Sequence, residues 1–177
     1  MPTWSQDTYL AALAFAARAH QGQTIPGSDL PYVIHVVQVC MEVMAASDEM
    51  VQADLAIQCA LLHDTLEDTS TTFAQLQGAF GSEVAEGVQA LTKNTHLTKD
   101  QAMLDSLQRI QTQPKEVWMV KLADRITNLQ TPPHFWTSQK IALYRAEAEI
   151  ILRELGPASP YLAQRLAQKI EAYRAFE

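Results

Sequence analysis

The chain has no useful run in which apolar and polar residues alternate with a period of two, and this absence constrains its fold most. A half-buried strand needs that alternation, whereas a helix packed on a core repeats its apolar positions about every three to four residues. Residues 6–20 follow the helical repeat, with Leu10, Leu13 and Ala17 on one face. The sequence therefore predicts an all-α fold.

Glycine, proline and capping residues divide the chain into the expected helices. Thr72 with Gln75, and Thr98 with Gln101, match the capping box, in which each partner satisfies a free amide of the other. Segment 21–31 carries two glycines and two prolines and is expected to be a loop. Ser82 and Ser138 are expected to be helix N-caps, and Pro31, Pro114 and Ser159-Pro160 are expected to open helices. We expect a bundle of eight or nine helices, over residues 6–20, 31–46, 52–67, 72–81, 82–91, 99–112, 115–130, 138–155 and from 159 onward.

Composition excludes several classes of protein. With 177 residues, of which 47% are hydrophobic, residues 1–177 are expected to form a single domain. The net charge is −7 and no lysine or arginine run occurs, which argues against a general nucleic-acid binder. No stretch approaches the ~20 apolar residues of a membrane span. The N-terminal MPTWSQDTYL lacks the basic region of a secretory signal. We expect a cytoplasmic protein in which Cys40 and Cys59 are buried free thiols.

The sequence LLHDTLEDT, residues 61–69, places four ionisable groups at the end of an apolar helical run. His63 and Glu67 lie four residues apart, as do Asp64 and Asp68, so each pair shares a helix face. Because a buried charge without a partner costs several kcal/mol, these groups need water, a helix N-terminus, a basic residue or a metal ion. No basic residue lies nearby in the sequence.

Two further polar residues lie within apolar helical patterns. His35 stands in PYVIHVVQV and Asp124 in VKLADRITNL. Taken singly, His35 fits a hydrogen-bonded core residue, and Asp124 fits a partner of a basic or amide side chain on its own helix. Taken together with His63 and Asp64, they supply two imidazoles and two carboxylates from three helices, a donor set that suits one divalent ion.

The order of these residues resembles the HD-domain metal-dependent phosphohydrolases. The motifs HQGQ, PYxxH, ALLHDTxEDT, FGxxV, LTK and KLADRxxNL occur in that order between about Arg18 and Tyr144. They are similar to the hydrolase domain of the RelA/SpoT-type alarmone enzymes, and the short chain resembles a stand-alone small alarmone hydrolase. The synthetase half of the long bifunctional enzymes has no room here, so we expect alarmone degradation and not synthesis.

The resemblance implies removal of the 3′-pyrophosphate from (p)ppGpp, which gives GDP or GTP and pyrophosphate. It implies manganese as the ion, although the nitrogen and oxygen donors suit manganese, iron or cobalt alike. It also implies that Glu67 and Asp68 are the catalytic pair, a role that fits a base one turn beyond the ligands. The alternative is that they end the helix or hydrogen-bond the ligand histidines.

Phosphate groups need cations and the nucleoside needs flanking side chains. Most candidates have a structural alternative, such as a solvated helix face, an intrahelical salt bridge or aromatic packing. His20, His96 and His134 lack a ligand-like context and are interpreted as surface or capping residues, although the family keeps a histidine beside the pocket at the position of His20. The candidate substrate-binding residues are Arg18, Tyr32, Lys93, Lys121, Asn128 and Tyr144.

Three departures from the family pattern concern base recognition. The loop after HQGQ reads TIPGSD and has no cation, Val36 replaces a common proline, and Thr127 stands where a histidine is frequent. The base preference therefore stays open between (p)ppGpp and (p)ppApp. Other open alternatives are a different HD-domain substrate, such as the 2′-phosphate of NADPH or a nucleoside monophosphate, and a non-catalytic nucleotide sensor. Apolar stripes at Ile150, Ile151 and Leu155 fit either a core or the seam of a homo-oligomer.

Overall fold

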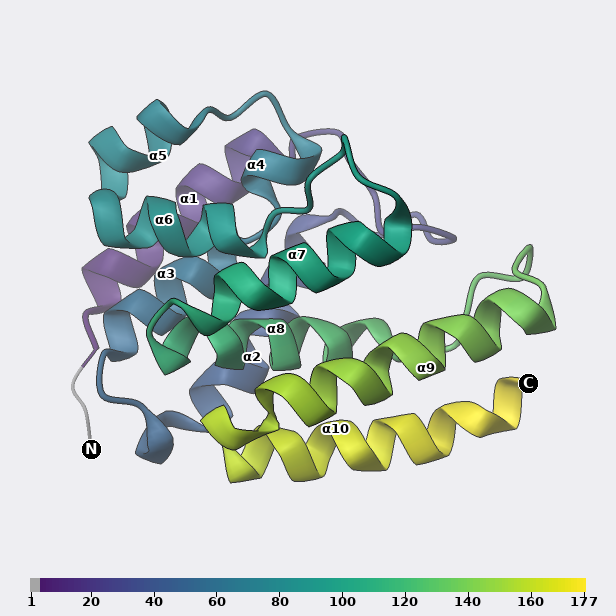
Figure 1. Cartoon of the computed structure of the whole chain (residues 1–177). Helices are drawn as coiled ribbons and strands as arrows, with labels where there is room; N and C mark the ends of the chain where they lie inside the picture. Colours follow the sequence, from purple (N-terminus) through teal and green to yellow (C-terminus); the bar gives the residue numbers. More distant parts are fainter. Residues whose placement is uncertain (1–3) are drawn as a thin grey trace.

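The computed structural model describes residues 4–177, and the first three residues of the N-terminal segment lie outside the described residues. Within residues 4–177 the helices are accompanied by one isolated bridge between Thr24 and Pro31, so the all-α prediction is confirmed (Figure 1). The helices are α1 (Gln6–Ala19), α2 (Val33–Ala45), α3 (Ala53–Leu62), α4 (Thr65–Asp68), α5 (Phe73–Phe80), α6 (Ser82–Leu91), α7 (Lys99–Gln111), α8 (Lys115–Asn128), α9 (Ser138–Leu155) and α10 (Pro160–Tyr173), with 3₁₀ turns η1 (Ser47–Glu49), η2 (Gly156–Ala158) and η3 (Arg174–Phe176). Among the described residues, nine helices have 8 or more residues and α4 has 4, which agrees with the expected eight or nine.

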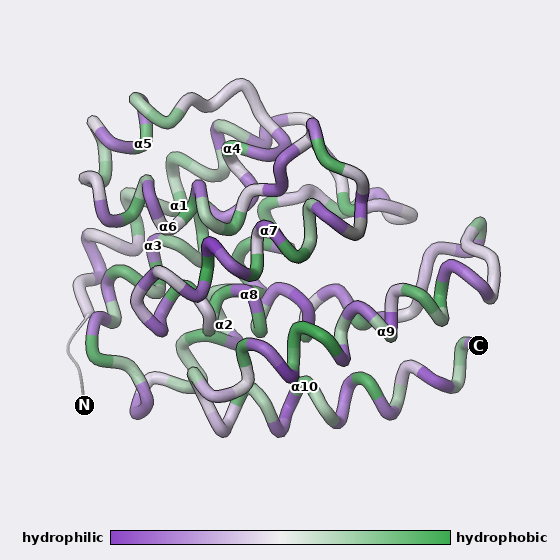
Figure 2. The backbone as a smooth tube through the Cα atoms, in the orientation of Figure 1, coloured by the Kyte–Doolittle hydropathy of each residue, from purple (hydrophilic) through white to green (hydrophobic). Residues whose placement is uncertain are grey.

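Helices α3 and α8 form the centre of the molecule. Helix α3 packs against α1, α2, α6 and α8, and α8 packs in addition against α9 and α10. Eight of the ten residues of α3 are buried, which explains its nearly uninterrupted apolar sequence. Helices α9 and α10 run side by side in opposite directions (Figure 1), and hydrophobic and hydrophilic residues interleave along both (Figure 2). Side chains on α8 and at the end of α3 are therefore held by the two central helices.

Capping residues define most helix boundaries as expected. Both capping boxes form, at Thr72 with Gln75 and at Thr98 with Gln101. Ser159 accepts a hydrogen bond from the amide of Leu162 and caps α10. Two expected helix caps are wrong: the N-cap of α6 is Gly81, and that of α9 is Thr137, whose hydroxyl accepts from the amide of Lys140. The serines expected there, Ser82 and Ser138, are the first helical residues.

The helix expected over residues 52–67 is interrupted, and this is the correction with the greatest consequence. Helix α3 ends at Leu62, His63 and Asp64 form a turn, and α4 begins at Thr65. The Thr65 hydroxyl donates to the carbonyl of Leu62 at 2.7 Å, while His63 Nδ1 lies 2.8 Å from the carbonyl of Ala60. Such local bonds replace the helical ones and bend the chain. The turn lets neighbouring side chains at 63 and 64 reach one point.

Several simpler expectations also have outcomes. Cys40 and Cys59 are free and buried, as predicted, and burial raises the pKa of the Cys40 thiol to about 12. Ile151 and Leu155 lie in the core, and Ile150 packs partly buried against it. In the part of the chain that the structure describes, no helix combines the length and apolar character needed to span a membrane. Helix α2 starts at Val33, two residues after Pro31, because Pro31 is held in the bridge to Thr24.

Candidate active site

Four side chains from three parts of the sequence converge at the centre of the bundle. His35 lies in the first turn of α2, His63 and Asp64 form the turn after α3, and Asp124 lies in α8. The side chains of His35, His63 and Asp124 are nearly inaccessible to solvent. Three of the four, those of His35, His63 and Asp64, each offer a donor atom within 4.8 Å of the other two.

Asp124 completes the cluster from the opposite side. Its Oδ1 lies 3.5 Å from His35 Nε2 and 3.8 Å from His63 Nε2. Asp64 Oδ2 lies 2.9 Å from His63 Nε2 and 3.5 Å from His35 Nε2. Both imidazoles thus direct Nε2 toward two carboxylates. His63 Nε2 is buried and has no partner at hydrogen-bonding geometry within the described residues.

The charges of the cluster are strongly coupled. Burial alone raises the pKa of a carboxyl, but His63 and His35 hold the pKa of Asp64 well below its ordinary value. Burial is likewise outweighed at Asp124, whose pKa is lowered by Lys121 and His35. Burial lowers the pKa of an imidazole, yet hydrogen bonds to Asp124 and Asp64 raise that of His35 to about 9. The site therefore stabilises positive charge between two ionised carboxylates.

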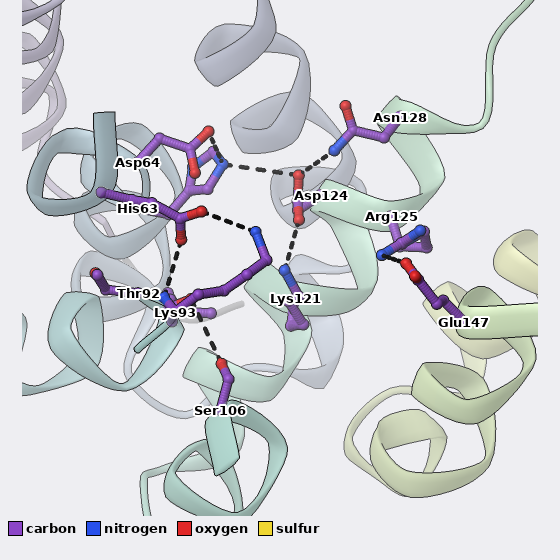
Figure 3. Close-up of polar contacts among 12 residues, drawn as sticks. His63, Asp64, Thr92, Lys93, Ser106, Lys121, Asp124, Arg125, Asn128 and Glu147 are labelled. Carbon is purple, nitrogen blue, oxygen red and sulfur yellow. Dashed lines mark hydrogen bonds and ion pairs between the residues drawn. The ribbon is translucent and has the colours of Figure 1, made fainter. Parts of the chain in front are cut away.

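Glu67 and Asp68 lie on α4, one turn beyond the cluster. Both carboxylate oxygens of Glu67 are engaged by Lys93, one by its backbone amide at 2.9 Å and the other by Nζ at 2.8 Å. Burial, together with the charges of Asp64 and Glu67, raises the pKa of Asp68. Figure 3 shows the Lys93 side chain extended beside His63 and Lys121. Lys93 thus fixes the orientation of the Glu67 carboxylate.

Three further side chains hold the carboxylates of the cluster in place. Lys121 Nζ donates to Asp124 Oδ2 at 2.9 Å, and Asn128 Nδ2 donates to Oδ1 at 2.5 Å (Figure 3). The hydroxyl of Tyr32 donates to Asp64 Oδ2 at 2.6 Å. Every oxygen that faces the imidazoles therefore has its direction set by a second hydrogen bond.

A cavity of about 130 Å³ opens beside the cluster and brings most of the predicted site residues together. Three candidates are not among its lining residues: His35 lies buried behind the cluster's carboxylates, Arg18 is exposed in the last turn of α1, and Tyr144 packs partly buried against Trp136 and beneath the Arg125 guanidinium. The lining residues are Tyr32, His63, Asp64, Glu67, Asp68, Leu91, Lys93, Lys121, Asp124 and Asn128.

Sequence reasoning missed a polar group that supports this cavity. His20 is the C-cap of α1, as one interpretation had it, but it is buried and not at the surface. The Nδ1 of His20 contacts Gln23 Oε1 at 2.7 Å, and Gln23 Nε2 donates to the Asp68 carbonyl at 2.7 Å. The centre of the His20 ring lies 4.8 Å from that of the Tyr32 ring. The HQGQ motif was the available signal. His96 and His134 are exposed, as expected.

Comparisons with known proteins converge on one family. The sequence profile of the HD domain matches residues 12–151. The guanosine-3′,5′-bis(diphosphate) 3′-pyrophosphohydrolase MESH1 of Danio rerio is 30% identical over 164 residues, which cover 90% of each chain. The guanosine-3′,5′-bis(diphosphate) 3′-pyrophosphohydrolase of Vibrio cholerae is 36% identical over 142 residues, but these cover only 19% of that longer protein. A solved metazoan SpoT ortholog, described as hydrolysing ppGpp, matches 99% of this chain with a TM-score of 0.85 at 24% identity, which supports the fold.

Proposed function

Because this chain belongs to the HD-domain family, and within it to the guanosine-3′,5′-bis(diphosphate) 3′-pyrophosphohydrolases, we propose that it is a hydrolase that removes the 3′-pyrophosphate of (p)ppGpp. The products are GDP or GTP and pyrophosphate. The observation that carries the proposal is the convergence of two imidazoles and two carboxylates beside the lysine-bound Glu67. The substrate is thus a small nucleotide that contains a diphosphate.

The residues of the cluster fit a divalent ion, for which we propose manganese. His63 Nδ1 contacts the carbonyl of Ala60, which leaves the buried Nε2 directed at the cluster, 2.9 Å from Asp64 Oδ2 but without a partner at hydrogen-bonding geometry among the described residues. Such a nitrogen costs free energy unless it meets a cation or a donor. Two imidazoles and two carboxylates form the mixed set that transition metals favour. We propose His35, His63, Asp64 and Asp124 as the ligands.

A bound divalent ion polarises a phosphate oxygen and stabilises the negative charge that develops during displacement. The chain's own residues direct the ligands toward that position. Lys121 and Asn128 hold the two oxygens of Asp124, and Tyr32 holds one oxygen of Asp64. Fixed carboxylates lose less conformational freedom when an ion binds, so these bonds favour a preorganised site.

We propose Glu67 and Asp68 as the catalytic pair. In the reaction, the oxygen of a water molecule forms a bond to the phosphorus attached to the ribose 3′-oxygen, and the bond between that phosphorus and the 3′-oxygen breaks. The Glu67 carboxylate accepts the proton that the water loses, and the 3′-oxygen gains a proton to become the hydroxyl. The raised pKa of Asp68 suits the group that donates the proton to the 3′-oxygen.

The cavity also contains the groups that we propose to bind the substrate. Lys93 and Lys121 supply positive charge for the scissile diphosphate. Asn128 has a second amide hydrogen for a phosphate or ribose oxygen, and the oxygen of the Tyr32 hydroxyl can accept from a ribose hydroxyl. Tyr144 and Arg18 stay outside this set, because neither is among the lining residues.

Manganese-loaded protein tests the proposal directly. Incubation with ppGpp is expected to release GDP and pyrophosphate in equal amounts, separated by ion-exchange chromatography, and EDTA is expected to abolish the release. A parallel series with ppApp and NADPH measures the preference for the base and for the 3′-pyrophosphate over a 2′-phosphate. Failure to turn over ppGpp and ppApp with manganese, iron or cobalt would overturn the proposal.

A further inference from the structure

A second, smaller cavity lies directly beside the candidate active site, between α7, α8 and α9. Its volume is about 40 Å³, and it shares Lys93 and Lys121 with the larger cavity. Lys99 from α7 and Arg125 and Glu147 from α8 and α9 complete its polar lining. Figure 3 shows Lys121 below Asp124, between Lys93 and the Arg125–Glu147 pair. One substrate molecule can therefore contact both cavities.

The charge of this second cavity is unbalanced. Four cationic side chains line it, but Lys93 is paired with Glu67 and Lys121 with Asp124, which leaves Lys99 and Arg125 to the single carboxylate of Glu147. Glu147 is shared, because Lys99 Nζ and Arg125 Nη2 both contact it, the latter at 3.5 Å. One carboxylate cannot neutralise two cations, so the cavity favours a further anion.

Arg125 shows the same deficit at the level of hydrogen bonds. Arg125 is only 6% exposed, and its guanidinium carbon lies 4.0 Å from the centre of the Tyr144 ring. Its two terminal nitrogens make long contacts, at 3.3 Å to the carbonyl of Tyr144 and at 3.5 Å to Glu147. Its Nε is buried and has no partner within the described residues. A guanidinium has five donors, and leaving donors unpaired in a buried site is costly.

We infer that this cavity binds one phosphate group, and that the group is a phosphate of the 5′-diphosphate of the alarmone. A volume of about 40 Å³ exceeds the ~10–15 Å³ needed for one water, and it suits one compact oxyanion rather than a base. The inference rests on the proposed function, since it assigns the second diphosphate of the same substrate. Lys99 and Arg125 are then specificity residues, which raise kcat/KM for nucleotides that carry a 5′-phosphate. A free phosphate ion offers the same chemistry, and the experiment separates these two sources.

The test compares two substrates, ppGpp and guanosine 3′-diphosphate, which lacks the 5′-phosphates. Wild-type protein loaded with manganese is expected to have a kcat/KM at least about tenfold higher for ppGpp, the factor for one charged hydrogen bond. In Lys99→Ala this preference is expected to fall about tenfold, with turnover of guanosine 3′-diphosphate unchanged. Lys99 suits this test because its side chain is 69% exposed, so its loss leaves the core intact. Lys115→Ala is the matched control, because Lys115 is exposed at the start of α8.

The outcomes distinguish the two proposals. If neither substrate is hydrolysed, the proposed function fails. If wild-type protein hydrolyses both equally well, or if Lys99→Ala keeps the full preference for ppGpp, the 5′-phosphate assignment alone is overturned. Titration calorimetry with inorganic phosphate tests for a free-ion site. If the wild type binds phosphate, Lys99→Ala does not, and the substrate preference is the same in both, the cavity is assigned to free phosphate instead. Arg125→Lys, which retains the charge but loses Nε, is expected to lower the ppGpp preference less than Lys99→Ala does.

Discussion

Helix α2 contributes to two buried ionic clusters that differ in how completely they are satisfied. His35 belongs to the candidate active site, and Glu42, seven residues later, pairs with Arg165 of α10. Both residues are 5% exposed. Arg165 holds Glu42 in a bidentate pair, Nε to Oε2 at 2.6 Å and Nη2 to Oε1 at 2.7 Å. In the other cluster, His63 Nε2 has no partner at hydrogen-bonding geometry in the part of the chain that the structure describes.

The difference shows that burial of charge alone does not mark a functional site. The Glu42–Arg165 pair uses both carboxylate oxygens and joins two helices, which is a complete structural role. The cluster in the candidate active site directs two imidazoles at two carboxylates, and His63 Nε2 stays available to bind a ligand. Substitutions in the first cluster should change stability, and those in the second should change activity.

The largest expected effect is the loss of activity in His63→Ala. Removal of one of the four proposed ligands should lower kcat/KM by at least ~10³-fold, since a catalytic metal ion supplies several kcal/mol of transition-state stabilisation. Pyrophosphate release and metal content by mass spectrometry measure the two losses together. His96→Ala is the control, because His96 is exposed. A fully active His63→Ala would refute the assignment of this ligand.

Glu67→Gln should separate catalysis from metal binding. The amide keeps the shape of the carboxylate but accepts no proton, so kcat should fall by about 10²-fold while metal content stays at the wild-type level. Glu83→Gln, at the exposed start of α6, makes the same chemical change away from the cavity. If Glu67→Gln loses the metal as well, Glu67 acts on the ligands and not on the water.

The sequence was sufficient for those parts of the site that depend on local pattern. The four proposed ligands were found because His35 and Asp124 interrupt apolar helical patterns and because HD follows an apolar run. Both capping boxes were found because their partners lie only three residues apart. The break after Leu62 was missed, since the Thr65 and His63 side chains that bond to the preceding turn are compatible with a continuous helix in sequence.

The second cavity was not predictable, because its cations come together only through packing. Lys99 and Arg125 lie on different helices and meet at Glu147, which is 48 residues from Lys99 in the sequence. Tyr144 was predicted to flank the nucleotide, and in the structure it packs against Trp136 and beneath Arg125, which lines the second cavity. Long side chains such as lysine and arginine reach several points from one backbone position, so the sequence alone does not fix their targets.

Arg165→Met should break the structural cluster without affecting the reaction. The variant leaves the Glu42 carboxylate buried and without its partner, which should cost about 2 kcal/mol of unfolding free energy, below the range for a fully buried pair because Arg165 is partly exposed. Thermal unfolding should occur at a temperature lower by about 4–8 °C. At 25 °C, kcat and KM for ppGpp should equal those of the wild type. A change in kcat at unchanged stability would contradict the division between the two clusters.

Arg109 gives the smallest effect and the sharpest test, because it is a structural cation that lies next to the catalytic machinery. Its guanidinium donates to the carbonyls of Gln89, Ala90 and Thr92, at 2.6, 3.0 and 2.8 Å, and so fixes the end of α6 immediately before Lys93. Arg109→Ala should therefore cost about 1 kcal/mol of stability, because its side chain is partly exposed.

The same substitution should also lower kcat by a few-fold, since Lys93 orients Glu67 from this segment. Arg174→Ala removes an exposed arginine that pairs with the exposed Glu171, and it should change neither quantity. Thermal unfolding and kcat are measured for both variants, with Arg109→Lys as a partial rescue. If Arg109→Ala lowers stability and leaves kcat unchanged, the orientation of Glu67 does not depend on the end of α6. Arg109 then has a structural role only, like Arg165.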